Sequence, residues 1–413
     1  MAGLNETPSG ERVHIGFFGV RNAGKSSLVN AVTGQDLAVV SATPGTTTDP
    51  VRKAMELLPV GPVLIVDTPG LDDTGELGAL RVGKARRALD MADVAVLVVD
   101  ATHGMSALDG DLVAEFQRKG VPYAIALNKA DALSGGFTAR EGAVERDETG
   151  CRCARVQVSA LERVGVEELK RTIAALAGTV ERQRALVSDL VKPGDAVVLV
   201  VPIDSAAPKG RIILPQQQVI RDLVEAGAHA CVTSVEGLPS LMESLVQPPR
   251  LVITDSQAFG HVARIVPDDV PLTSFSILMA RYKGTLEEQV RALSAVDVLR
   301  DDDIVLIAEG CTHHRQCQDI GTVKLPVWIR EACGANPRFE FASGGDFPEH
   351  LGRYAAVVHC GGCMLNAREM EHRAQQASEQ RVPFTNYGMV IAKANGVFDR
   401  AIAALEKAEG GLL

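Results

Sequence analysis

The sequence predicts an α/β protein in which a doubly wound, mostly parallel sheet is followed by two smaller α/β domains. Short apolar segments alternate with helix-length amphipathic segments along residues 13–178, a pattern typical of a sheet with helices on both faces. A glycine-rich loop separates the first apolar segment from the first helix, where such folds bind phosphate. Shorter units of the same alternation continue beyond residue 190.

Two breaks in the alternation predict the domain boundaries. LVKPGDA at 190–196 carries a Pro-Gly break after a charged helix, and PDDVPL at 267–272 offers a second one. No internal repeat is evident from motif identity. The expected domains are residues 1–182, a nucleotide-binding domain, residues 183–270, a small α/β domain, and residues 271–413, a second small α/β domain that holds the cysteine motifs.

Composition and charge limit the functional class. Forty-two Lys and Arg against 52 Asp and Glu give a net charge of -10, which disfavours nucleic acids and anionic membranes as main partners. The apolar segments are shorter than the roughly 20 residues that cross a bilayer, and the first residues lack a signal pattern. We therefore expect a cytoplasmic protein, whose cysteines are more often metal ligands or catalysts than disulfides.

FFGVRNAGKSSLVN, residues 17–30, has the spacing of a phosphate-binding loop. Its two glycines let backbone N–H groups surround the phosphates at a helix N-terminus, while Lys25 reaches the β- and γ-phosphates and Ser26 ligates Mg²⁺. The expected nucleotide contacts in this loop are Asn22, Ala23, Gly24, Lys25, Ser26 and Ser27.

Three later segments indicate that the nucleotide is GTP. In DTPG at 67–70, Asp67 follows an apolar strand, where it can hold Mg²⁺, and the N–H of Gly70 can sense the γ-phosphate. In NKAD, Asp131 can accept two hydrogen bonds from guanine that adenine does not offer. The backbone amides of VSA can cap the guanine O6. The expected contacts on the guanine side are Asn128, Lys129, Asp131, Ser159 and Ala160.

With these motifs, residues 13–178 resemble the translation-factor-related GTPases of tRNA modification and ribosome assembly, with TPGTTTD at 43–49 as the first switch. The resemblance implies that Thr47 closes on Mg²⁺ and the γ-phosphate. It also implies that Asn22 binds K⁺, although asparagine commonly just shapes a turn. Leu71 stands where many small GTPases carry a water-positioning glutamine, so hydrolysis should be slow. The residues expected to carry hydrolysis are Lys25, Thr47 and Gly70.

Three of the eight cysteines follow predicted strands. Cys311 comes directly after DIVLIAEG, and Cys360 and Cys363 come after AAVVH, at the sheet edge where open α/β folds gather ligands. Three thiolates suit zinc completed by His313 or His359, or an iron–sulfur cubane with one iron open to an exchangeable ligand. A redox dithiol is disfavoured, because no thioredoxin-like βαβ pattern surrounds the pair. The spacing does not separate zinc from iron.

The order of the motifs along the whole chain resembles the [FeFe]-hydrogenase maturation GTPase family HydF. Cys-x-His followed by His-Cys-x-x-Cys carries this resemblance, together with VKPGDAVVLVVPIDSAAPKGRIILPQ, LVITDSQAF and PLTSFSILMARYKG. It implies a homodimer through the middle domain, a [4Fe-4S] cluster on Cys311, Cys360 and Cys363, and a scaffold that carries a transient diiron precursor. The implied partners are apo-[FeFe]-hydrogenase and the radical S-adenosylmethionine maturases HydE and HydG.

A second interpretation is a zinc-stapled GTPase in tRNA modification or ribosome assembly. The acidic balance and the aromatic content of 4% count against an RNA-binding surface. Cys151 and Cys153 are interpreted as unliganded thiols, and Cys317 does not match the cysteine motif. Arg281 and Lys283 can be interpreted either as charges that neutralise an anionic cluster or its cyanide-bearing cargo, or as solvated surface charges.

Overall fold

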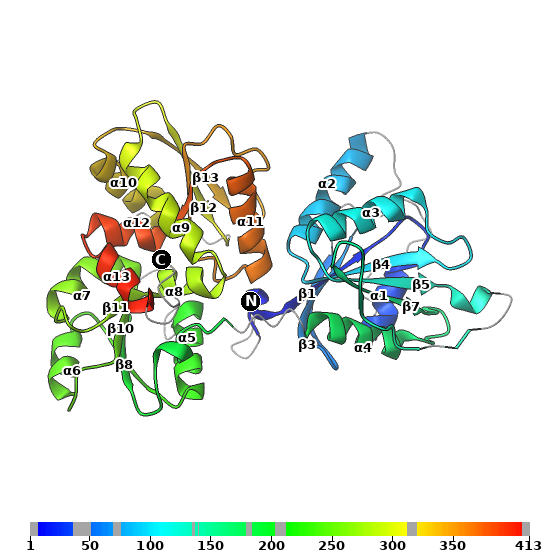
Figure 1. The fold of residues 1–413 in the computed structure, drawn as a ribbon, viewed down its shortest axis with the longest axis horizontal. Coiled ribbons are helices and arrows are strands. Elements are labelled where there is room, and N and C mark those ends of the chain that lie inside the picture. Colours follow the sequence, from blue (N-terminus) through cyan, green and yellow to red (C-terminus); the bar gives the residue numbers. More distant parts are fainter. Residues whose placement is uncertain are drawn as a thin grey trace. The chain divides into compact units, whose positions relative to one another are not determined.

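The computed structural model divides the chain into two compact units, Met1–Arg182 and Gln183–Leu413 (Figure 1). Both units contain largely parallel sheets packed against helices, so the predicted α/β class is confirmed. Among the described residues, no helix is both long and apolar enough to span a bilayer. The structure describes residues 7–35, 51–68, 76–133, 137–138, 140–178, 184–202, 212–311 and 320–406.

The first unit contains a seven-stranded sheet in the order β2-β3-β1-β4-β5-β7-β6. Its parallel strands are β1 (Val13–Phe18), β3 (Gly61–Asp67), β4 (Val94–Asp100), β5 (Tyr123–Asn128) and β7 (Arg152–Gln157). Two antiparallel strands, β2 (Val51–Leu57) and β6 (Glu145–Arg146), form the edges. Strands β1, β3, β4 and β5 are largely buried and apolar, as expected when both faces of a parallel sheet are covered, whereas β7, next to the β6 edge, is partly exposed.

Helices cover both faces of this sheet. They are α1 (Lys25–Thr33), α2 (Glu76–Asp90), α3 (Ala107–Arg118) and α4 (Val166–Ala177), with short helical turns η1 (Ser9–Glu11) and η2 (Ala130–Ala132). Ile15 and Phe17 of β1 point into one apolar core, and Phe18 points into the other. This alternation follows from the two-residue period of a strand.

The second unit contains two four-stranded parallel sheets, ordered β11-β10-β8-β9 and β13-β12-β14-β15. The strands of the first sheet are β8 (Ala196–Val200), β9 (His229–Thr233), β10 (Leu251–Thr254) and β11 (Leu272–Ser274). Those of the second are β12 (Ile304–Glu309), β13 (Arg338–Ser343), β14 (Ala356–His359) and β15 (Phe384–Asn386). The helices are α5 (Leu214–Glu225), α6 (Leu238–Ser244), α7 (Phe259–Ile265), α8 (Phe275–Tyr282), α9 (Leu286–Ala292), α10 (Leu325–Cys333), α11 (Ala367–Glu379), α12 (Tyr387–Ala394) and α13 (Phe398–Glu406), with the shorter η3 (Ser188–Leu190), η4 (Ser256–Ala258), η5 (Leu293–Val298) and η6 (Ile320–Lys324).

These two sheets are repeats of one topology. In each sheet the strands lie in the order second, first, third, fourth along the chain. Each fourth strand leads into a helix of the same length, α8 in the first half and α12 in the second. Leu-Pro begins both α5 and α10, the helices that follow the first strand of each half. The expectation that the chain has no internal repeat was therefore wrong.

The sequences of the two copies agree mainly where the backbone needs a particular residue type. PLTSFSILMARYKG at 271–284 aligns with PFTNYGMVIAKANG at 383–396. Ser274 and Asn386 cap α8 and α12 in the same way, by accepting from the third N–H along each helix. Gly284 and Gly396 end both segments with φ of 75° and 68°. Most other positions differ, which is why motif identity did not reveal the repeat.

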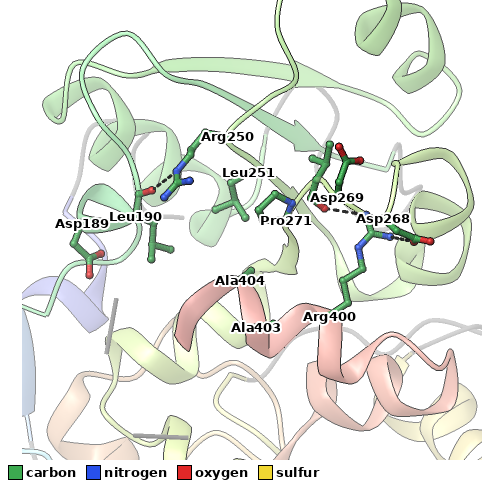
Figure 2. Close-up of a pocket in the computed structure, with 11 residues that line it drawn as sticks. Asp189, Leu190, Arg250, Leu251, Asp268, Asp269, Pro271, Arg400, Ala403 and Ala404 are labelled. Atoms are coloured by element: carbon green, nitrogen blue, oxygen red, sulfur yellow. Dashed lines mark hydrogen bonds and ion pairs between the residues drawn. The ribbon is translucent and has the colours of Figure 1, made fainter. Parts of the chain in front are cut away.

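The two halves of the second unit share one apolar core, to which both sheets contribute. Gly388 of α12 lies against α8, and a Cβ added there would be 2.7 Å from the Cβ of Ser276. Arg400 of α13 donates to the carbonyls of Val266 (3.2 Å) and Val270 (2.9 Å) in the first half. Figure 2 shows this arginine beside a pocket of about 260 Å³. The predicted boundary near residue 270 stays a prediction.

Candidate functional site

The loop between β1 and α1 has the backbone that a phosphate-binding loop requires. Gly19 (φ 146°), Asn22 (φ 64°) and Gly24 (φ 86°) all have positive φ. A Cβ would lie 2.4 Å from the Val98 carbonyl oxygen at Gly19, and 2.3 Å from Asn128 Nδ2 at Gly24. Both positions therefore require glycine. The loop leads directly into the N-terminus of α1, where backbone N–H groups and the helix dipole favour an anion.

Ser26 and Asp67 form the candidate Mg²⁺ site. The Ser26 hydroxyl donates to Asp67 Oδ2 at 3.2 Å. The other carboxylate oxygen, Oδ1, is buried and has no hydrogen-bond partner among the described residues. Burial raises the pKa of Asp67, and the neighbouring charge of Lys25 opposes that shift. A buried carboxylate oxygen without a donor, next to a hydroxyl and a lysine, fits a hard cation bound with phosphate.

Asn128 ties the phosphate-binding loop to the guanine side. Its Nδ2 donates to the carbonyl of Ala23 at 3.0 Å, and its Oδ1 accepts from the N–H of Ala160 at 3.0 Å. The N–H of Ser159 donates to the Val164 carbonyl at 2.9 Å. Both amides that we expected to face the guanine O6 thus donate within the protein in this arrangement.

Lys129 and Asp131 follow Asn128 at the end of β5. Lys129 has a positive φ of 60°, and its Nζ donates to Asp100 Oδ2 at 2.7 Å. Asp131 lies in η2 and is exposed, where a base can reach it. The expected contributors Thr47 and Gly70 lie outside the described residues, as does Leu71.

Cys311, Cys360 and Cys363 lie at one edge of the second sheet of the second unit. Strands β12 and β14 are adjacent and parallel, with Ala308 opposite His359, and the cysteines follow their carboxyl ends. The Cys360 sulfur accepts from the N–H of Gly310 at 3.1 Å and of Gly362 at 3.4 Å. Two amide donors to one sulfur are the environment that a thiolate prefers.

The three thiols influence one another. Burial, and after it the neighbouring Cys360, raise the pKa of Cys311 to about 12 and that of Cys363 to about 11. Within the described ranges, no group of three or more His, Cys, Asp or Glu side chains has a metal-binding arrangement. The sulfurs are thus neighbours without coordination geometry. Buried soft donors that repel one another as thiolates fit a group that brings positive charge.

His359 is fully buried and has both ring nitrogens engaged. Its Nδ1 donates to the Cys360 carbonyl at 2.7 Å, and its Nε2 accepts from Arg373 Nη1 at 2.9 Å. Burial and, after it, the Arg373 charge lower the pKa of His359 to about 3, so the ring is neutral. This geometry disfavours His359 as a metal ligand and supports the alternative, a hydrogen-bonding role. His313, the other candidate histidine, lies outside the described residues.

Sequence reasoning missed the network that holds His359. Arg373 of α11 is buried and also donates to the Gly344 carbonyl (2.7 Å) and to Glu369 Oε1 (2.6 Å). The spacing of Glu369 and Arg373, one helical turn apart after the Cys-Gly-Gly-Cys turn, was the available signal.

The other cysteines singled out in the sequence are not at this sheet edge among the described residues. Cys151 and Cys153 belong to the first unit. Cys151 is half-buried and its thiol donates to the Val121 carbonyl at 3.2 Å, while Cys153 is also half-buried, in β7. Neither forms a disulfide, and their interpretation as unliganded thiols stays a prediction. Cys317 belongs to the part of the chain that the structure does not describe.

Three family models match the chain. The model described as a hydrogen maturase F dimerization domain matches residues 186–284, and the hydrogen maturase F tetramerization domain matches residues 287–404. A 50S ribosome-binding GTPase model matches residues 14–129.

Known relatives of the first unit are GTPases. The tRNA modification GTPase MnmE of Bordetella petrii is 34% identical over 169 residues, covering 41% of this chain and 34% of that protein. MnmE of Halorhodospira halophila is 37% identical over 171 residues, covering 40% and 35%. The chain thus spans about a third of the length of these relatives. The crystal structure of Era from Aquifex aeolicus aligns with 18% identity and a TM-score of 0.33, covering 54% of this chain and 92% of that one.

Proposed function

The chain belongs to the hydrogen maturase F family of hydrogenase-maturation GTPases, and from this premise we propose that it is a scaffold for iron–sulfur chemistry. In this proposal it carries a [4Fe-4S] cluster on Cys311, Cys360 and Cys363 and delivers a diiron precursor to apo-[FeFe]-hydrogenase. The radical S-adenosylmethionine maturases HydE and HydG supply that precursor. Residues 183–270 form the dimer, and residues 271–413 hold the cluster.

One observation carries the proposal: three cysteines follow the carboxyl ends of two neighbouring strands at one sheet edge, where the Cys360 sulfur already accepts two amide N–H groups. A bound [4Fe-4S] cluster would supply four iron sites, and three thiolates would ligate three of them, which leaves one iron without a cysteine ligand. His359 is already hydrogen-bonded at both ring nitrogens, which supports an iron left open for an incoming anionic cargo.

The first unit hydrolyses GTP. We assign Mg²⁺ to Ser26 and Asp67, with Thr47 as the closing ligand, and a K⁺ ion to Asn22. Lys25 and the Gly70 N–H act on the γ-phosphate. Asp131→Asn should weaken GTP turnover and improve xanthosine triphosphate turnover, because the acceptor for two guanine donors is lost. Equal turnover of ATP and GTP by the wild type would remove the guanine assignment.

Metal analysis tests the cysteine site against a zinc-stapled GTPase, the alternative that the tRNA-modification relatives favour. The full chain is purified and reconstituted anaerobically, and its zinc, iron and acid-labile sulfide are counted. The proposal expects about four iron and four sulfide per chain and a spectrum of a reduced [4Fe-4S] cluster. Stoichiometric zinc without iron or sulfide after reconstitution would replace the scaffold with the zinc alternative.

A further inference from the structure

Lys283, directly after α8, is only 1% exposed. Lys283 lies within Coulombic reach of the Cys363 sulfur. Its Nζ lies 5.3 Å from the centroid of the Tyr282 ring. The alternative of a solvated surface charge is therefore wrong for Lys283.

Helix α8 packs directly on the turn that carries Cys360 and Cys363. A Cβ added to Gly361 would lie 3.6 Å from Ser276 Cα and 3.7 Å from Met279 Cβ. Ser276, Met279 and Lys283 are three and four positions apart, so they share one face of this helix and its last turn. Lys283 thus lies one turn further along the helix face that packs on the cysteine turn.

The neighbouring arginine has a different role. Arg281 binds Asp189 with both terminal nitrogens, at 2.9 Å to Oδ1 and 2.5 Å to Oδ2, and donates to the Ala185 carbonyl at 3.2 Å. This bidentate pair joins α8 to η3 within the second unit. Of the two basic residues singled out in the sequence, Lys283 is the one whose charge reaches Cys363.

The internal repeat provides an independent comparison. Asn395 is the counterpart of Lys283, and both cap their helices with nearly the same backbone, φ −82° and ψ −2° at Lys283 against φ −95° and ψ 3° at Asn395. Helix α12, which carries Asn395, packs on the polar turn of the first half, where a Cβ on Gly388 would lie 3.1 Å from Ser256 Oγ. The helix that faces thiols thus ends in a cation, and the helix that faces hydroxyls ends in a neutral amide.

We propose that Lys283 is a positioning residue that holds small anionic ligands at the metal cluster of the cysteine site. The inference rests on the proposed function, because it requires a cluster there. A fixed ammonium stabilises a bound anion over a neutral ligand of similar size, and it stabilises the reduced cluster, which carries one more negative charge. Lysine suits this role because its charge is compact.

The test uses full-length protein reconstituted anaerobically, with Lys283→Asn as the main variant. The fold accepts asparagine at this cap, since Asn395 occupies the equivalent position. Lys283→Arg keeps the charge. Lys393→Asn is the matched control. Lys393 lies on α12, the repeat counterpart of α8, and its ammonium pairs with Asp297 of η5. After iron and sulfide counts, an EPR-monitored redox titration gives the midpoint potential, and titrations with cyanide and imidazole compare an anionic with a neutral iron ligand.

We expect Lys283→Asn to keep its cluster, to bind cyanide at least tenfold more weakly and to bind imidazole as the wild type does. Without the ammonium, reduction of the cluster should become less favourable. A tenfold change in this one-electron equilibrium lowers the midpoint potential of the Lys283→Asn variant by about 59 mV. Lys283→Arg should recover part of both effects, and Lys393→Asn should show neither. If Lys283→Asn loses its cluster but Lys283→Arg keeps it, the positive charge at this position is what the cluster requires, which still supports the inference.

Unchanged potential and unchanged cyanide affinity in Lys283→Asn would overturn the inference, as would equal weakening of cyanide and imidazole. Loss of the cluster from both Lys283 variants would also overturn it, because the residue would then be structural. Wild-type protein that reconstitutes no iron would instead overturn the proposed function, so the two failures are distinguishable.

Discussion

The two halves of the second unit have the same sheet and differ in the turn after the third strand. In the first half, Asp255 comes after β10 and accepts from the Gln257 N–H at 3.2 Å, while the Ser256 hydroxyl lies 3.1 Å from that of Ser276. In the second half, Cys360 comes after β14 at the equivalent position. The polar side chains of the first turn hydrogen-bond within the turn and to α8, whereas the second turn carries the thiols of Cys360 and Cys363. The two copies of the four-stranded sheet therefore differ in a few residues at one edge, and only the second copy has cysteines after its first and third strands.

The largest expected difference between the halves is in iron content. Cys360→Ala should reduce iron and sulfide after anaerobic reconstitution to near zero, because an iron left without a thiolate gains no comparable anionic ligand. Asp255→Ala, at the equivalent position, should keep wild-type iron while it loses a helix cap worth about 1 kcal/mol. Cys311→Ala and Cys363→Ala should behave like Cys360→Ala. Equal iron in Cys360→Ala and Asp255→Ala would show that the sheet edge does not hold the cluster.

The next effect concerns stability. Arg373→Leu removes the buried donor to His359, Gly344 and Glu369, and it leaves the Glu369 carboxylate without that partner. Breaking a buried ion pair in this way costs about 3–5 kcal/mol. The single tryptophan, Trp328 in α10, reports on the second unit during urea unfolding.

The first half provides the control for Arg373→Leu. Thr254 occupies the position equivalent to His359, and its hydroxyl donates locally to the Asp255 carbonyl at 3.2 Å. Thr254→Val should therefore cost only about 1 kcal/mol, the value of one hydrogen bond. A loss below about 1 kcal/mol in Arg373→Leu would mean that the network does not stabilise the second half.

Packing between the repeats predicts a smaller loss. Gly388→Ala brings a Cβ within 2.7 Å of the Ser276 Cβ and 3.1 Å of Ser256 Oγ, and overpacking of this kind costs about 1–3 kcal/mol. Ser276→Gly, the reciprocal change on α8, should cost about 1 kcal/mol through lower helix propensity together with the lost hydrogen bond from Ser256. The double variant should lose less than the sum, because Ser276→Gly makes room for the new methyl group. Strict additivity in Trp328 unfolding curves would contradict this contact.

How far the sequence predicted the molecule depends on how local each feature is. The loop with Gly19 and Gly24 was predictable, because a contiguous motif fixes its own backbone. The common edge of Cys311 and Cys360 was predictable from strand ends in a parallel sheet. The burial of Lys283 was not, since it depends on α8 of one half packing against a turn of the other. The repeat was missed because its copies share caps and glycines rather than a continuous motif.

The smallest expected effect is at His359, the residue before Cys360. Because Nδ1 donates to the Cys360 carbonyl and Nε2 accepts from Arg373, neither nitrogen is left for iron in this arrangement. His359→Gln supplies one amide donor and one carbonyl acceptor in place of the ring. It should therefore keep most of the wild-type iron and sulfide and leave the EPR spectrum of the reduced cluster unchanged, with a modest loss of stability. Cys363→Ala, prepared in parallel, shows the iron content and the EPR spectrum expected when a ligand is lost. If His359→Gln unfolds in urea like the wild type by Trp328 fluorescence and yet binds as little iron as Cys363→Ala, then His359 turns toward the metal on loading and acts as a ligand. Retention of iron, in contrast, would confine ligation to the thiolates and assign His359 and Arg373 to holding the Cys360 backbone in place.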